Sequence, residues 1–115
     1  MPKTLIIIPS YNEQINIVKL ISALFSLYHD CDVLVVDDSN DNTPELIKEE
    51  QAKYPNLFLI KRNGKEGRGT AVIEGLRFGQ QKDYDFFVEM DADLSHQPKE
   101  LSKLLNSARV DAVVI

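Results

Sequence analysis

Short hydrophobic runs alternate along the chain with segments in which hydrophobic residues recur at helical spacing. The hydrophobic runs are four to seven residues long and are bounded by polar residues, glycine or proline. Runs of this kind are typical of strands that are covered on both faces of a sheet. The predicted strands are Thr4–Ile8, Val33–Val36, Leu57–Ile60, Tyr84–Met90 and Asp111–Ile115.

Four helices are predicted between these strands, at about residues 13–28, 43–53, 70–80 and 98–107. Ser10 or Asn12 is expected to cap the first helix, because a side-chain oxygen there can accept from the free amides of the first turn. Thr43 and Pro44 predict the start of the second helix. In the third helix, the spacing predicts that one face carries Val72, Ile73, Leu76 and Gly79.

Strands that alternate with helices predict βαβ units with right-handed crossovers. We therefore expect an α/β fold: a Rossmann-like, mostly parallel sheet with helices on both faces. In such sheets, ligands bind outside the carboxyl ends of the strands. The unusual loops of this chain all follow predicted strands, which indicates a binding site at that edge of the sheet. These loops are residues 9–13, 37–43, 62–69 and 91–98.

Two carboxylates with one residue between them follow the fourth predicted strand. Side chains alternate along a strand, so Asp91 and Asp93 would share one side if the strand continued into the turn. Hard carboxylate oxygens suit Mg²⁺ or Mn²⁺ carried by a diphosphate. An acidic turn at a strand end has the same spacing, so the pair alone leaves both interpretations open.

The two preceding acidic loops offer groups for a nucleotide. Tyr11 can lie against a base or ribose, and Glu13 can accept hydrogen bonds from sugar hydroxyls or base N–H groups. Asp37 and Asp38 can bind a base or ribose edge, as an acidic residue does in dinucleotide-binding folds. Each of these residues also has an ordinary structural role open to it, in loop packing or at a helix start.

The glycine-rich loop after the third strand brings Arg62, Lys65 and Arg68 to the start of a helix. Backbone amides and the helix dipole favour anions there, so a diphosphate is one candidate ligand. The loop is not a P-loop, because the Gly-x-x-x-x-Gly-Lys-Ser/Thr pattern is absent from the sequence. Basic residues that are merely solvated would give the same pattern.

Composition narrows the class of protein. The 115 residues correspond to one domain at most, and 43% hydrophobic with 27% charged residues is ordinary for a soluble globular chain. The net charge of −5 argues against nucleic acid as a partner, since non-specific binding needs a basic surface. The single Cys31 excludes an internal disulfide and fits a reducing, cytoplasmic location.

A response-regulator receiver domain is the main alternative from another class of protein. Residues 33–39 resemble the acidic pair of a receiver, and the chain length is close to that of one. In a receiver the pair follows the first strand and a phosphorylated Asp follows the third. Here the pair follows the second strand and the third ends in Ile60 and Lys61, so the order of the motifs argues against this alternative.

All four loops together, in order and at similar spacing, resemble the dolichyl-phosphate (polyprenyl-phosphate) mannosyltransferases. These are inverting glycosyltransferases with a GT-A fold. The resemblance covers essentially the whole chain. The matching motifs are Pro9-Ser10-Tyr11-Asn12-Glu13, Val35-Val36-Asp37-Asp38-Ser39 with Thr43, Arg62 with Gly67-Arg68-Gly69-Thr70-Ala71, and Met90-Asp91-Ala92-Asp93-Leu94-Ser95-His96-Gln97-Pro98.

The resemblance implies a set of site residues. Asp91 and Asp93 would hold the Mg²⁺ or Mn²⁺ ion and act as the catalytic residues, and both would contact the diphosphate sugar together with Ala92. Ser95 stands where some relatives have a glutamine as a third metal ligand, and because serine reaches less far, we expect water to complete that shell. The residues expected to contact the nucleotide are Pro9, Tyr11, Glu13, Val36 and Asp38.

The resemblance also implies a reaction, the transfer of mannose from GDP-mannose to dolichyl or polyprenyl phosphate with inversion. It implies peripheral attachment to the cytoplasmic face of a membrane through a downstream part. Residues 1–115 would form the nucleotide-diphosphate-sugar-binding part, and because the chain stops within a predicted strand, we expect a fragment that can be inactive alone. Another sugar donor (UDP-glucose or a UDP-N-acetylhexosamine) and a non-catalytic metal-dependent nucleotide-binding module remain open.

Overall fold

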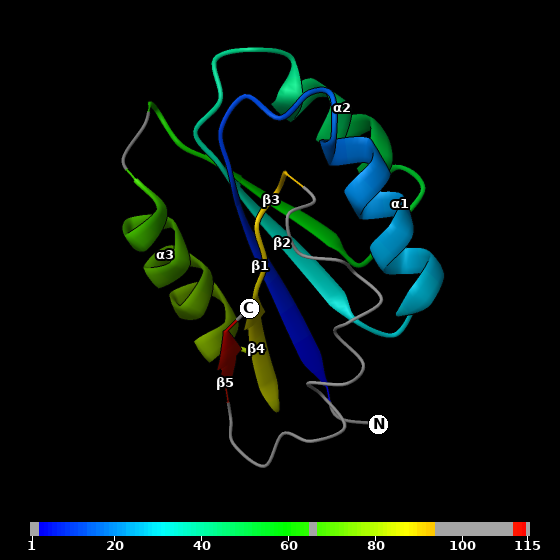
Figure 1. Ribbon diagram of the computed structural model, residues 1–115. Coiled ribbons are helices and arrows are strands. Elements are labelled where there is room, and N and C mark those ends of the chain that lie inside the picture. Colours follow the sequence, from blue (N-terminus) through cyan, green and yellow to red (C-terminus); the bar gives the residue numbers. More distant parts are fainter. Residues whose placement is uncertain (1–2, 65–66, 94–111, 115) are drawn as a thin grey trace.

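The computed structural model describes residues 3–64, 67–93 and 112–114, which form one twisted sheet with helices on both faces (Figure 1). All ladders between the strands are parallel, and the strand order is β3-β2-β1-β4-β5. The Rossmann-like α/β prediction is confirmed. The strands are β1 (Thr4–Ser10), β2 (Asp32–Asp37), β3 (Leu57–Lys61), β4 (Phe86–Glu89) and β5 (Ala112–Val114). The helices are α1 (Ile17–Leu27), α2 (Thr43–Gln51) and α3 (Arg68–Gln80), and the helix predicted at 98–107 lies outside the described residues.

The central strand β1 is buried on both faces. Helices α1 and α2 cover one face of the sheet and α3 covers the other (Figure 1). Ile6 and Ile8 join the core under α1 and α2, whereas Leu5 and Ile7 join the core under α3. Because successive side chains point to opposite faces, a strand in this position is hydrophobic along its middle, as at Leu5–Ile8. This is why β1 and β2 read as continuous hydrophobic runs.

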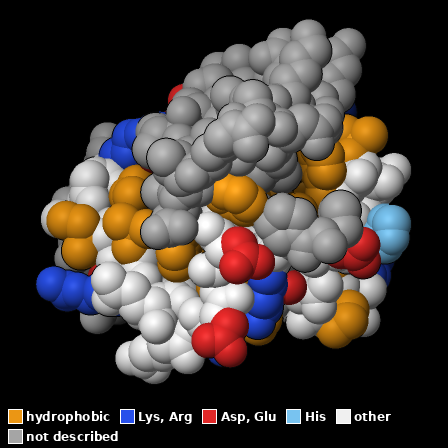
Figure 2. All heavy atoms as spheres, turned by 90° about the horizontal axis from the view of Figure 1, so that it is seen from below, with side chains coloured by type: hydrophobic (Ala, Val, Ile, Leu, Met, Phe, Trp, Pro, Cys, Tyr) orange, Lys and Arg blue, Asp and Glu red, His pale blue; other side chains and the backbone are white. Residues whose placement is uncertain are grey.

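The strand order changes direction between β1 and β4. The chain first builds outward from β1 to β2 and β3, and then returns to place β4 on the other side of β1. Open α/β sheets bind ligands outside the carboxyl ends of the strands at such a switch in strand order. Seen from below, at the opposite edge of the sheet, acidic and basic side chains lie next to one another (Figure 2).

The first helix begins later than predicted. It starts at Ile17, and its N-terminal residue Asn16 makes no side-chain capping bond. Ser10 and Asn12 do not cap it, so that prediction is wrong: Ser10 donates to Asp37, and Asn12 bonds to the loop after β2. The chain is held in this loop, with Asn12 at a φ of 53°, before the helix can form.

Small residues, rather than large ones, face the sheet from α3. Ala71, Gly75 and Gly79 are its buried residues, whereas Ile73 is 49% exposed, so the predicted placement of Ile73 is wrong. A Cβ atom on Gly75 would lie 2.6 Å from Cγ2 of Ile7, and one on Gly79 would overlap the ring of Phe87. The glycines let the helix backbone approach the large side chains of β1 and β4 closely.

Replacing Gly79 with alanine is expected to destabilise the protein. The new methyl group would overlap Phe87, and overpacking of a core costs about 1–3 kcal/mol. This exceeds the gain in helix propensity of about 1 kcal/mol. Gly69→Ala is a matched control in the same helix, because nothing lies within 4 Å of its added Cβ. Urea denaturation of both variants would contradict the argument if Gly79→Ala were as stable as Gly69→Ala.

Cys31 is a buried core residue immediately before β2. Its side chain is 5% exposed and packs with the core under α1 and α2. Burial, with the nearby Asp32 and Asp30 carboxylates, raises the pKa of the thiol to about 11. The thiol is therefore protonated and unreactive at neutral pH.

None of the helices in the described part of the chain is long and apolar enough to cross a membrane.

Candidate functional site

Asp37, the last residue of β2, ties the first two loops together from inside. Its carboxylate is 0% exposed. Oδ1 accepts hydrogen bonds from the hydroxyls of Ser10 and Ser39, both at 2.6 Å, and Oδ2 accepts from the Ser39 amide at 3.2 Å. These bonds satisfy the buried charge within the protein. Asp37 is therefore a structural residue, and its interpretation as a base-binding group is wrong.

Further bonds between the same loops position Tyr11 and Glu13. The amide of Asn12 donates to Ser39 Oγ at 2.7 Å, and Asn12 Oδ1 accepts from the Asn40 amide at 2.9 Å. The amide of Glu13 donates to Thr43 Oγ1 at 3.0 Å. The loop after β1 is thus fixed on both sides of Tyr11, a residue that stays 40% exposed.

Asp38 forms a buried ion pair with Arg62. Arg62 Nε donates to Asp38 Oδ1 at 2.7 Å and Nη2 donates to Oδ2 at 2.6 Å, a bidentate arrangement with both side chains under 8% exposed. The same guanidinium donates to the Gly67 carbonyl and to Thr70 Oγ1, both at 3.0 Å. Arg62 therefore faces inward and holds the start of α3, instead of facing an anion in solvent as the sequence suggested.

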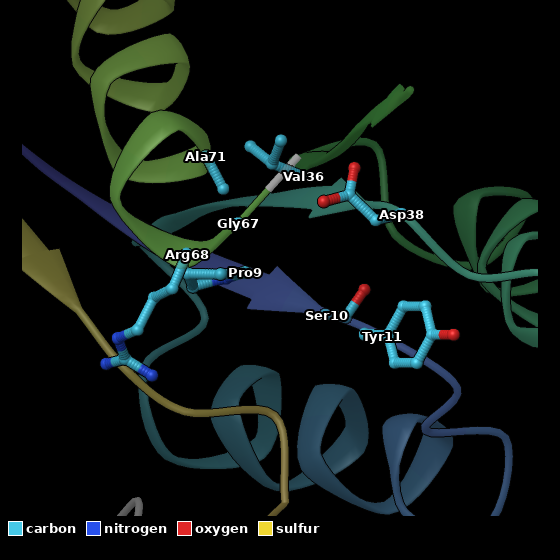
Figure 3. Close-up of a pocket in the computed structure, with 8 residues that line it drawn as sticks. All are labelled: Pro9, Ser10, Tyr11, Val36, Asp38, Gly67, Arg68 and Ala71. Carbon is cyan, nitrogen blue, oxygen red and sulfur yellow. The ribbon is translucent and has the colours of Figure 1, made fainter. Parts of the chain in front are cut away.

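A pocket of about 130 Å³ lies above the carboxyl ends of β1 and β2 (Figure 3). Four of the expected nucleotide contacts line this pocket. One of them, Asp38, is held in place by its hydrogen bonds from Arg62. Four lining residues were not among the expected contacts, although the glycine-rich loop pointed to part of this set. The lining comprises Pro9, Tyr11, Val36 and Asp38, together with Ser10, Gly67, Arg68 and Ala71.

A second pocket of about 210 Å³ shares Pro9, Tyr11 and Arg68 with the first. It extends toward the turn after β4, where Asp91 is partly buried, Ala92 is buried and Asp93 is exposed. Apolar groups form most of the wall of the first pocket, whereas three carboxylates line the second. Its lining comprises Pro9, Tyr11, Glu13, Arg68, Asp91, Ala92 and Asp93. The fold thus gathers all eight expected substrate contacts around two joined pockets.

Arg68 is the only cationic side chain among the described residues that line these pockets. It is the first residue of α3, and Figure 3 shows its side chain extending away from Asp38 toward the segment after β4. Its guanidinium forms ion pairs with Glu89, at the end of β4, and with Asp91. The Arg68 side chain is 49% exposed, whereas its partner Glu89 is only 12% exposed.

The carboxylates of the second pocket fit a hard divalent ion. Asp91 and Asp93 present oxygen ligands at one pocket wall, the kind that Mg²⁺ and Mn²⁺ prefer. Within residues 3–64, 67–93 and 112–114, no three acidic, histidine or cysteine side chains converge closely enough to hold an ion alone. An ion here would complete its shell with water and diphosphate oxygens, as Mg²⁺ commonly does. Ser95, the expected third ligand, lies outside the described residues.

Known proteins match both the sequence and the fold. The chain is 40% identical over 114 residues to the undecaprenyl-phosphate mannosyltransferase of Micrococcus luteus, covering 98% of this chain and 47% of that protein. It is 40% identical over 112 residues to the polyprenol monophosphomannose synthase of Mycolicibacterium smegmatis, covering 96% of this chain and 42% of that protein. The chain therefore spans less than half the length of these curated relatives.

Among solved structures, the chain resembles a mannosyltransferase of Pyrobaculum calidifontis in complex with GDP-Man and Mn²⁺. The TM-score is 0.71 and the identity 26%, with 80% of this chain and 28% of that chain covered. The sequence model of glycosyl transferase family 2 matches residues 5–115, nearly the whole chain. The receiver alternative is thereby excluded. On its sequence and its GT-A-like sheet, this chain belongs to glycosyl transferase family 2.

Proposed function

We propose that the chain is the donor-binding part of a glycosyltransferase that transfers mannose from GDP-mannose to a polyprenyl phosphate with inversion. The observation that carries this proposal is the pair of joined pockets, one with apolar walls and a fixed carboxylate, the other lined by carboxylates. A nucleoside and a metal-bound diphosphate need this combination side by side. The names of the two bacterial relatives and the GDP-Man complex of the archaeal neighbour support mannose as the sugar.

In this proposal the first pocket holds the nucleoside. Pro9 and Val36 supply apolar walls, and the exposed ring of Tyr11 lies against the base or ribose. Asp38 has both oxygens bonded to Arg62, yet each carboxylate oxygen accepts more than one hydrogen bond. Asp38 therefore offers a base or ribose donor an acceptor whose orientation is already fixed.

The second pocket receives the diphosphate and the sugar. Asp91 and Asp93 would hold Mg²⁺ or Mn²⁺, Ala92 would contact the diphosphate sugar, and Ser95 would contribute through water. The bound ion would supply neutralisation of the charge on the departing diphosphate. Glu13, held by Thr43 at the edge of this pocket, would accept hydrogen bonds from sugar hydroxyls or base N–H groups.

The proposed transfer reaction does not require a strong general base from the protein. An acceptor phosphate oxygen is already anionic, so it can attack the anomeric carbon while the bond from that carbon to the GDP oxygen breaks. The residues described here would bind and orient the donor. The acceptor lipid places the reaction at a membrane surface, so the proposal includes peripheral attachment at the cytoplasmic face.

Nucleotide titration and a transfer assay test the proposal together. With Mn²⁺ present, calorimetry should show that the chain binds GDP more tightly than UDP, and labelled mannose should pass from GDP-mannose to a short polyprenyl phosphate. Tighter binding of UDP would favour a UDP-glucose or UDP-N-acetylhexosamine donor instead. GDP binding without transfer by this chain alone would support the donor-binding role and not the transfer, since a donor-binding part can be inactive by itself. Binding of neither nucleotide would refute the proposal.

A further inference from the structure

We propose that Arg68 is a diphosphate-binding residue that is held by Asp91 and Glu89 until the donor and its metal ion arrive. The inference rests on the proposed function and adds a residue to it. In the structure, the guanidinium of Arg68 pairs with both carboxylates. Binding of an ion to Asp91 would displace Arg68, and the diphosphate would offer the guanidinium a new partner.

The position of Arg68 on its helix points to a ligand. It is the first residue of α3, where the dipole disfavours a cation, so the helix gains nothing from an arginine there. The same helix start presents backbone amides to anions. An arginine beside these amides adds a planar fork that can bind two phosphate oxygens together.

The ion pairs of Arg68 are exchangeable. The Arg68 side chain is 49% exposed, so solvent and ligands can reach its guanidinium, although Oδ1 of Asp91 in this pair is itself buried. This contrasts with Arg62, whose bidentate pair with Asp38 is almost entirely buried. Arg62 is therefore fixed, whereas Arg68 can move between partners at the junction of the two pockets.

The charges around the second pocket favour movement of Arg68 from the carboxylates to the diphosphate once a metal ion is bound. Without a ligand, Glu13, Asp91 and Asp93 all line the second pocket, and Arg68 offsets part of their negative charge. A divalent ion takes over that task for Asp91 and Asp93. Arg68 is then no longer needed to offset the charge of these carboxylates, and its guanidinium can bind the negatively charged diphosphate instead.

The test is Arg68→Gln, measured separately with Mn²⁺ alone and with GDP at saturating Mn²⁺. Loss of the competing cation should strengthen binding of Mn²⁺ alone by about two- to fivefold, the range that exposed ion pairs give. Loss of the diphosphate contact should weaken GDP binding by roughly five- to tenfold. Arg68→Lys, which keeps the charge without the fork, should bind Mn²⁺ like the unchanged protein and GDP with intermediate affinity.

Arg77→Gln is the matched control, since Arg77 is an exposed arginine in the last turn of the same helix and lines neither pocket. It should change neither affinity. If Arg68→Gln weakens both ligands or changes neither, the inference is wrong, and thermal melting would reveal a variant that is simply unfolded. If the unchanged protein binds Mn²⁺ but no GDP, the proposed function fails, and the diphosphate part of the inference fails with it.

Discussion

Arg62→Leu is expected to lower the free energy of unfolding by about 3–5 kcal/mol, the usual cost of leaving one partner of a buried ion pair alone. Arg62 and Asp38 are 3% and 7% exposed, so solvent cannot replace the lost guanidinium. The variant also loses the hydrogen bonds to the Gly67 carbonyl and to Thr70. The start of α3 would then detach from the loop after β2. Urea denaturation followed by circular dichroism measures the change.

The double variant Asp38→Leu with Arg62→Leu separates the two contributions. It removes both charges, so most of the loss should be recovered if the unpaired carboxylate is the cause. Arg77→Leu, an exposed position on α3, should stay within about 0.5 kcal/mol of the unchanged protein. An Arg62→Leu variant as stable as Arg77→Leu would show that the Asp38 pair contributes nothing to folding.

Removal of divalent ions is expected to abolish measurable GDP binding. Glu13, Asp91 and Asp93 line the second pocket, and without an ion they would repel a diphosphate. Calorimetry in Mn²⁺ and then in EDTA compares the two states directly. GDP binding that persists undiminished in EDTA would rule out a metal bridge between these carboxylates and the diphosphate.

The same assay distinguishes ligation from loop charge. Asp93→Asn should weaken Mn²⁺-dependent GDP binding by at least about tenfold, a loss that even outer-shell partners of metal sites produce. Asp41→Asn is the matched control, because Asp41 lies in a loop at a strand end but outside both pockets. Asparagine also keeps the oxygen that accepts from Thr43. Equal losses in the two variants would mean that loop charge, and not ligation, governs binding.

Much of the fold could be predicted from the sequence, because buried strands and helices each have a characteristic spacing of hydrophobic residues. Strands with both faces covered are hydrophobic along their middle, so β1 and β2 were visible as runs. Parallel strands bring their following loops to one edge, so the loops carrying Tyr11, Asp38 and Asp91 could be assigned to one site before their positions were known.

Only the tertiary structure decided which member of each similar pair faces the site. Asp37 and Asp38 are adjacent, yet Asp37 is bonded within the protein by Ser10 and Ser39, while Asp38 lines a pocket. Arg62 and Arg68 belong to one loop region, yet one is buried and the other half exposed. Except for Ser39, the partners that make these differences lie more than twenty residues away in the sequence, and local spacing does not reveal them.

The buried face of α3 is a second feature that the sequence pattern alone did not predict. Helical spacing placed hydrophobic side chains toward the core, as it does for most amphipathic helices. The sheet instead presents Ile7 and Phe87 so close to the helix that glycines face them at positions 75 and 79, while Leu76 and Phe78 pack at the side of the same core. The sequence by itself determined that α3 forms and that it ends near Gln80, although the helix begins two residues earlier than predicted, at Arg68. The size of the side chains opposite decided which face α3 buries, because closely packed surfaces leave no room for both sets of large side chains.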